Sequence, residues 1–280
     1  MPELPEVETV RRSLAKAALG RRVVRFEWRR EDLRHPIPVE RLAELLPGQR
    51  FEELERRGKL LIGRFGDRRR RPHCLLAHLG MSGRFQVSSP AEPWLKHEHY
   101  RLVLEGVELR YIDPRRFGSL EYAAADELEG HPRLANIGVE PLGPGFDGAL
   151  LYTACRRRSL AIRDLLLSGR PVAGVGNIYA NEACFRSGIR PQRRARTLSR
   201  RDCATLCAEI KAVLTEAIEA GGSTLRDAGY VDAAGRAGWF QFAHFVYDRA
   251  DEACRRCQQG QVKRVQRMAR GAFYCPICQS

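Results

Sequence analysis

The chain opens with residues that could form a covalent bond to a sugar. It begins Met1-Pro2-Glu3, and Glu6 follows within one helical turn. Removal of Met1 makes Pro2 the amino terminus, and a free α-amino group, with a pKa of about 8, is unprotonated at neutral pH far more often than a lysine amine. A neighbouring glutamate can supply a proton. On these residues alone, however, Pro2 and Pro5 are better interpreted as the start of a helix.

A second candidate site lies at the other end of the chain, where four cysteines have the spacing C-x2-C-x17-C-x2-C. They are Cys254, Cys257, Cys275 and Cys278. Two such pairs predict a β-hairpin that closes one structural Zn²⁺ site, because four protein thiolates leave no open position for catalysis. The alternative, four core cysteines, is disfavoured by the paired spacing. The hairpin is basic and has no acid between its cysteines, which favours contact with phosphate over a solvated turn.

The charge composition indicates which class of molecule the protein binds. The 280 residues include 48 Lys and Arg against 34 Asp and Glu, a formal net charge of +14. This excess favours a polyanion, with nucleic acid ahead of an acidic membrane surface. No apolar run is long enough to span a membrane, and no secretory signal is visible. The other five cysteines are therefore expected to be buried thiols of a reducing cytoplasm; they are Cys74, Cys155, Cys184, Cys203 and Cys207.

The elements that must position these groups change in type along the chain. A helix is expected after Pro5, with an apolar face that includes Val7 and Leu14, and Gly20 marks its end. From 22 to 123 short β-type runs alternate with turns, which predicts a β-sandwich. These runs include Val23–Trp28, Leu60–Phe65, Cys74–Leu79, Tyr100–Leu104 and Val107–Ile112, with a solvated hairpin tip at Arg68–Arg71.

The second half is helical. Residues 131–148 are dense in Pro and Gly, as in a connector. Two short helices are expected at Ala161–Leu167 and Asn177–Phe185, and a longer one starts at the capping box Ser199–Asp202. The glycine turn before Asn177 could bind a phosphate at a helix start. It lacks the nucleotide-binding fingerprints, so ATP and NAD are not expected.

Six motifs occur in an order that resembles the bacterial formamidopyrimidine-DNA glycosylase family of base-excision repair. They are Pro2–Thr9, Arg57–Lys59, His78–Gly83, Asp113–Gly118, Gly174–Glu182 and the four-cysteine hairpin. The resemblance spans nearly the whole chain, and Leu4 favours this branch over the endonuclease VIII branch, which typically has Gly there.

The resemblance implies an α+β fold with DNA held in a cleft between domains. The implied limits are a β-sandwich domain over 1–132, a linker over 133–150, a helix–two-turns–helix domain over 151–222, a lesion-capping region over 223–243 and a zinc hairpin over 244–280. The expected protein is a cytoplasmic monomer that acts on double-stranded DNA with oxidised bases or abasic sites. Zn²⁺ is its one expected cofactor, and the elimination itself needs no metal.

The resemblance also implies a role for each site residue. Pro2 forms a Schiff base with C1′ of the deoxyribose, Glu3 protonates the sugar ring oxygen, and Glu6 orients the amine or a water. Lys59 contacts phosphate and assists β-elimination, and Arg270 holds the lesion phosphate and promotes δ-elimination.

Further residues match DNA contacts. Because the damaged nucleotide must leave the stack, three side chains fill the gap: Met81, Arg115 and Phe117, with Arg115 bonding the orphaned cytosine. The remaining matches are His97, Arg158 and Asn177. The expected activity is that of a bifunctional glycosylase and abasic-site lyase, which releases 8-oxoguanine and formamidopyrimidines and then cuts the strand by β- and δ-elimination.

The chain departs from the family pattern in places. The segment Ser223–Gln241 is longer than usual, and Asp164 stands where proline is common. The zinc hairpin has one extra residue, and Met268-Ala269 stand before Arg270 where small glycine-type residues are frequent. The first departure leaves open a preference for oxidised pyrimidines. A non-catalytic zinc protein that binds DNA or RNA is the third hypothesis, and the intact Pro2-Glu3 pair argues against it.

Overall fold

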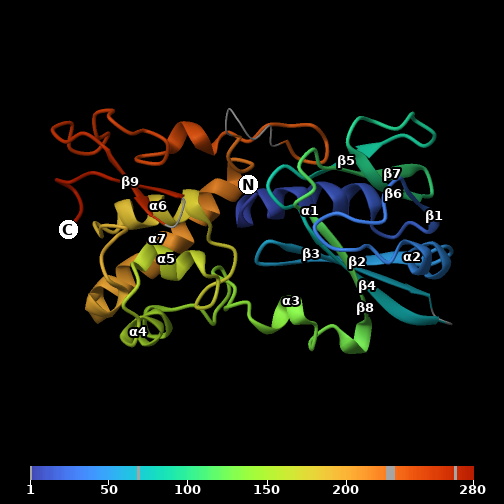
Figure 1. Cartoon of the computed structure of the whole chain (residues 1–280), viewed down its shortest axis with the longest axis horizontal. Coiled ribbons are helices and arrows are strands. Elements are labelled where there is room, and N and C mark those ends of the chain that lie inside the picture. Colours follow the sequence, from blue (N-terminus) through green and yellow to red (C-terminus); the bar gives the residue numbers. More distant parts are fainter. Residues whose placement is uncertain (1, 68–69, 225–230, 268–269) are drawn as a thin grey trace. The chain divides into compact units, whose positions relative to one another are not determined.

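The computed structural model describes residues 2–67, 70–224, 231–267 and 270–280 (Figure 1). Contacts divide the chain into two compact units, Met1–Ala135 with Ala220–Trp239, and Asn136–Glu219 with Phe240–Ser280. The expected removal of Met1 falls outside the described residues, as do Arg68 and Arg69 of the expected hairpin tip.

The first unit contains a β-sandwich, as predicted. One antiparallel sheet has the order β1-β6-β7-β5 and the other the order β2-β3-β4-β8. The strands of the first are β1 (Val23–Trp28), β5 (Arg84–Ser88), β6 (Glu98–Leu104) and β7 (Val107–Ile112). Those of the second are β2 (Arg50–Arg57), β3 (Leu60–Asp67), β4 (Arg70–His78) and β8 (Ser119–Ala124). Apolar side chains of both sheets share one buried core.

Helix α1 (Leu4–Ala18) closes this core with its predicted apolar face. Val7, Val10 and Leu14 are buried there, and Gly20 follows the helix end with a φ of +81°. Shorter helical segments α2 (Val39–Leu45), η1 (Ala125–Glu127) and α3 (Pro132–Ala135) were not predicted. Their few residues carry too little periodicity to distinguish them from loops.

The second unit is helical and ends in a β-hairpin. Its elements are α4 (Gly148–Arg156), α5 (Ile162–Leu167), α6 (Asn177–Arg186), η2 (Ala195–Thr197), α7 (Arg200–Glu219), η3 (Phe240–Ala243), β9 (Lys263–Arg267) and β10 (Arg270–Tyr274). The capping box before α7 is confirmed. Asp202 accepts from the Ser199 N–H at 2.9 Å, and the Asp202 N–H donates to Ser199 Oγ at 3.1 Å. The α+β prediction is therefore confirmed in both units.

Two expectations from composition can be compared with the structure. The five cysteines outside the hairpin are buried free thiols, as predicted. Among the described residues, no helix is both long and apolar enough to cross a membrane.

Candidate functional site

The amino-terminal residues are fixed at the start of α1 by a hydrogen-bonded carboxylate. Glu3 is the N-cap of α1, and its N–H donates to Glu6 Oε2 at 2.8 Å. The other oxygen, Oε1, accepts from the Ser223 N–H at 2.8 Å. Both glutamates are 2% exposed, and Pro2 is buried beside them. Glu6 therefore holds the Pro2-Glu3 backbone and the segment at Ser223 in one arrangement.

Gly222 explains how this segment approaches so closely. Its φ is +84°, and a Cβ there would lie 2.9 Å from Glu6 Oε1. Both the backbone conformation and the space thus favour glycine. The sequence separation of Glu6 and Ser223 hid this contact, so neither Ser223 nor Gly222 was predicted as a site residue.

Lys59 lies in the turn between β2 and β3, close to a histidine that was not predicted as a site residue. Gly58 precedes it with a φ of +59°, at the position where type II′ hairpin turns place glycine. Leu60 pairs with His78, and His78 pairs with Ser119 on β8. These pairings bring Lys59 and His78 to the same end of the sheet.

His78 is held neutral. Burial lowers its pKa to about 4, and the positive charges of Arg133, Lys59 and Arg34 act in the same direction. The Gly80 N–H donates to His78 Nδ1 at 3.0 Å. A neutral ring that accepts at Nδ1 carries its proton on Nε2, so His78 is a hydrogen-bond donor in basic surroundings.

The three predicted gap-filling side chains lie on two adjoining loops. Met81 and Phe117 are 38% and 42% exposed, unusual for large apolar side chains, and Arg115 is exposed as well. The Arg115 guanidinium lies 4.9 Å from the centre of the Phe117 ring. The loops touch through Gly80, where a Cβ would lie 2.4 Å from the Phe117 carbonyl carbon. The structure thus brings together all three residues.

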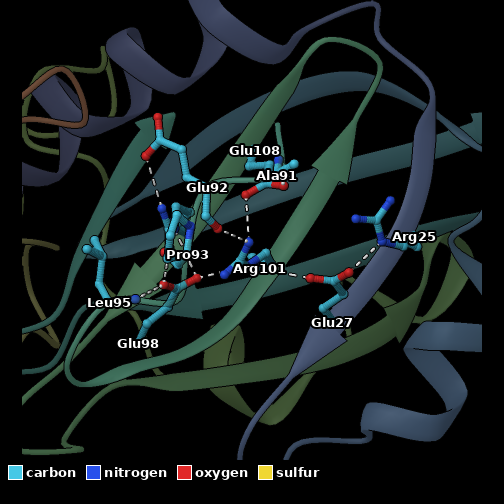
Figure 2. Close-up of polar contacts among 10 residues, drawn as sticks. Arg25, Glu27, Ala91, Glu92, Pro93, Leu95, Glu98, Arg101 and Glu108 are labelled. Atoms are coloured by element: carbon cyan, nitrogen blue, oxygen red, sulfur yellow. Dashed lines mark hydrogen bonds and ion pairs between the residues drawn. The ribbon is translucent and has the colours of Figure 1, made fainter. Parts of the chain in front are cut away.

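His97 is exposed with a φ of +63°, at the end of a segment anchored on the outer face of a sheet. Figure 2 shows the anchor, a cluster of buried ion pairs on β6 and β7. Glu98 pairs with Arg101 at 3.0 Å and with Arg110 at 2.6 Å. Both arginines also bond the segment itself, Arg101 to the Glu92 carbonyl and Arg110 to the Pro93 carbonyl.

In the second unit, α6 holds the strand that begins at Arg270. Asn177 Nδ2 donates to the Gly271 carbonyl at 3.1 Å, and its Oδ1 accepts from Arg163 Nε at 2.9 Å. Asn181, fully buried, accepts from the Phe273 N–H at 2.8 Å. Arg270 itself is exposed. The Asn177 side chain therefore supports the hairpin. The backbone N–H of Asn177 lies in the first turn of α6, where backbone donors have no partner within the helix.

Glu182, in the same motif, binds the chain that leads into the hairpin. It is fully buried and accepts from the N–H groups of Phe245, Val246 and Tyr247 at 2.9, 3.0 and 2.8 Å. Burial raises the pKa of this carboxyl, and the three N–H donors oppose that rise. The motif Gly174–Glu182 signalled these residues without revealing their partners.

Arg158 lies on the exposed loop after α4, where its carbonyl accepts from the Arg196 N–H at 3.1 Å. Within the described part of the chain, no carboxylate lies within ion-pairing distance of its guanidinium. Its charge is thus available to an anionic partner.

The four hairpin cysteines fit one metal ion. Their sulfur atoms all lie within 4.8 Å of one another. The pairs Cys254–Cys278 and Cys257–Cys275 are both 3.8 Å apart, and Zn–S bonds of about 2.3 Å in a tetrahedron require sulfurs about 3.8 Å apart.

The thiols of this cluster differ widely in pKa. The N–H of Gly260 is the main cause that lowers the pKa of Cys257 to about 6, whereas burial and the neighbouring thiols raise that of Cys278 to about 12. A bound dication must therefore displace protons from the cluster.

Comparisons with known proteins cover the whole chain. Residues 1–120 match the formamidopyrimidine-DNA glycosylase N-terminal domain, and residues 137–228 match the H2TH domain of the same glycosylases. The formamidopyrimidine-DNA glycosylase of Thiobacillus denitrificans is 47% identical over 280 residues, which cover 100% of both chains. A Lactococcus lactis Fpg mutant in complex with Fapy-dG containing DNA is 32% identical, with 100% of both chains covered and a TM-score of 0.91.

The wild-type Lactococcus lactis protein, in complex with DNA that contains an oxidised pyrimidine, has a TM-score of 0.90 at 32% identity, again over 100% of both chains. Sequence and structure agree along the full length, and the chain is therefore a member of the formamidopyrimidine-DNA glycosylase family.

Proposed function

We propose that this protein is a bifunctional DNA glycosylase and abasic-site lyase of base-excision repair. Its substrates are formamidopyrimidines and 8-oxoguanine in double-stranded DNA, and abasic sites. The observation that carries the proposal is the arrangement at the start of α1, where the Glu6 carboxylate accepts from the Glu3 N–H and from the Ser223 N–H, each at 2.8 Å. A protein that only binds nucleic acid needs neither a secondary amine at Pro2 nor a carboxyl group beside it.

The proposed reaction starts at the Pro2 nitrogen, once Met1 has been removed. The amine attacks C1′ of the damaged nucleotide, the bond from C1′ to the base breaks, and the base leaves with that electron pair and a proton. Glu3 protonates the ring oxygen as the sugar opens, which gives an iminium ion on Pro2. Loss of a proton from C2′ expels the 3′ phosphate, a second elimination expels the 5′ phosphate, and water releases the sugar fragment from Pro2.

Phosphate binding is proposed for five predicted residues and one that the structure adds. Lys59 and Arg270 serve the phosphates at the lesion, while His97, Arg158 and the N–H of Asn177 bind further along the backbone. His78 joins Lys59 because a neutral imidazole with its proton on Nε2 donates a hydrogen bond without needing to be charged. Met81, Arg115 and Phe117 fill the gap left by the everted nucleotide.

We also propose one structural Zn²⁺ held by Cys254, Cys257, Cys275 and Cys278. The sulfur separations support Zn²⁺ because they match its tetrahedral thiolate geometry. The ion ties the two ends of the hairpin together, and α6 then bonds the strand that carries Arg270. The domain limits given by the resemblance, monomeric action and a cytoplasmic location are part of the same proposal.

Borohydride trapping tests the chemistry. The protein, incubated with a duplex that contains an abasic site or a formamidopyrimidine, should form a covalent adduct on reduction, and Pro2→Gly should form far less. Failure of the wild-type protein to form an adduct on either duplex would refute the proposed reaction. Undiminished trapping by Pro2→Gly would remove Pro2 from the mechanism.

An oxidised-pyrimidine preference is a second candidate, because a structural relative was solved with DNA that contains an oxidised pyrimidine. The long segment 223–241 bears on this choice, and residues 225–230 of it lie outside the described residues. A panel of single-lesion duplexes decides between the two. Faster release of thymine glycol than of 8-oxoguanine would favour the second candidate.

A further inference from the structure

Asp113, at the end of β7, has a side chain that no predicted role uses. It is fully buried, and its carboxylate accepts four hydrogen bonds. Oδ1 accepts from Ser82 Oγ at 2.6 Å and from the Arg115 N–H at 3.2 Å. Oδ2 accepts from the Gly118 N–H at 2.9 Å and from the Tyr111 hydroxyl at 3.3 Å. One carboxylate therefore joins the Met81 loop to the loop that carries Arg115 and Phe117.

The backbone of Asp113 adds a third loop to this arrangement. Its N–H donates to the His97 carbonyl at 2.9 Å, and its own carbonyl bonds His99 Nε2 at 2.8 Å. All the exposed residues of the first unit that were predicted to touch DNA beyond the lesion phosphate thus either bond Asp113 directly or adjoin a residue that does. They are Met81, His97, Arg115 and Phe117.

These loops need such a restraint. His97 and Arg116 have φ values of +63° and +56°, and side-chain-bearing residues adopt that region only where the surroundings hold them there. Asp113 is also costly to bury, and no cation in the described chain pairs with it. Its burial is offset by hydrogen bonds from the loops themselves. The carboxylate and the loops therefore stabilise each other, and neither arrangement is expected without the other.

We propose that Asp113 is a positioning residue, which sets Met81, Arg115 and Phe117 in the geometry needed to enter the duplex as the damaged nucleotide leaves it. This inference rests on the proposed function. It predicts that Asp113 contributes to the reaction on duplex substrates, in which the damaged nucleotide must be everted and its partner base is left unpaired. It matters little for Schiff-base formation on a substrate that requires neither.

Two substrates and three variants test the inference. Asp113→Asn keeps the shape of the side chain but turns one acceptor into a donor that faces an N–H or O–H group. Ser82→Ala removes the 2.6 Å bond from the Met81 loop to Asp113, together with a 3.3 Å bond that Ser82 Oγ accepts from the Arg115 N–H. Glu108→Gln is the matched control, because Glu108 is an equally buried carboxylate on β7 that bonds Arg101 and the Ala91 N–H instead.

The substrates are a duplex with a formamidopyrimidine opposite cytosine and a single-stranded oligonucleotide with an abasic site. Single-turnover excision from the duplex should fall by about 100-fold in Asp113→Asn, a loss typical of a displaced positioning group. Borohydride trapping on the single strand should stay within about twofold of wild type. Ser82→Ala should show a smaller loss in the same direction, and Glu108→Gln should leave the ratio of the two activities unchanged.

Discrimination between cytosine and adenine opposite the lesion supplies a readout that general destabilisation does not change. It should shrink in Asp113→Asn, because Arg115 no longer meets the partner base correctly. Equal losses on both substrates, or a ratio unchanged in both Asp113→Asn and Ser82→Ala, would overturn the inference. A wild-type protein inactive on both substrates would instead refute the proposed function, and this inference with it.

Discussion

Acidification should destabilise the first unit through His78. Its pKa falls from an ordinary 6.5 to about 4 because the half-buried ring is poorly solvated, with three cations nearby. Between these two values the unfolded chain binds a proton that the folded chain does not, so stability is complete above about pH 6.5 and declines as the pH falls towards 4. The full loss is about 3 kcal/mol. At pH 5.5 it is about 1.4 kcal/mol, a tenfold change in the unfolding equilibrium.

The assay is urea unfolding at pH 7.5 and 5.5, followed for wild type and His78→Asn. Asn keeps an acceptor for the Gly80 N–H but cannot be protonated, so the variant should lose less stability than wild type across this interval by about 1.4 kcal/mol. His35→Asn, at an exposed position, is the matched control. His244, whose pKa burial also lowers to about 4, should produce a similar decline in the second unit. Parallel pH curves for wild type and His78→Asn would show that His78 is not held neutral by the fold, and would remove the reason for assigning it a donor role.

Three further outcomes are expected. Cys275→Ser should lose the bound zinc measured by elemental analysis and weaken binding to abasic-site duplex; full zinc content in this variant would refute the four-thiolate site. Arg158→Ala should weaken DNA binding evenly across sequences and reduce the slope of log K against log salt by about 1, and an unchanged slope would remove Arg158 from the interface. Glu6→Gln should lower the free energy of unfolding by about 1.5–3 kcal/mol, because one of two buried charge-assisted bonds is lost. It should also slow adduct formation at Pro2, and a variant that traps at the wild-type rate would show that Glu6 does not hold the proposed nucleophile.

Sequence reasoning succeeded where one local pattern determines one local structure. The apolar face of α1, the capping box at Ser199 and the cysteine pairs each depend on residues only a few positions apart. The strand runs were likewise recognisable from composition and turns. The short helices α2 and α4 were not predicted, because each buries only two residues and so has little apolar pattern, whereas α5, which was predicted, buries five of its six residues.

The candidate site was recognisable in the sequence as a set of motifs but not as a set of contacts. The motif around His78 was recognised through Met81, and nothing in the sequence indicates that the ring is half-buried among cations. Glu6 meets Ser223 across more than two hundred positions, and Glu182 meets Tyr247 across more than sixty. Such pairings depend on the path of the whole chain, so only the fold reveals them.

Three acidic residues inside the recognised motifs share one physical role. Glu6, Asp113 and Glu182 are all buried, and each accepts backbone N–H groups from a segment that carries predicted site residues or leads to them. A buried carboxylate is costly when left alone and becomes tolerable when several donors converge on it. An irregular segment, in turn, has N–H groups that no helix or sheet satisfies. Each such pairing gives the buried carboxylate its hydrogen-bond donors and gives the N–H groups an acceptor, and it fixes a loop that has no regular secondary structure. The acids of these three motifs are thus explained largely by the loops they hold.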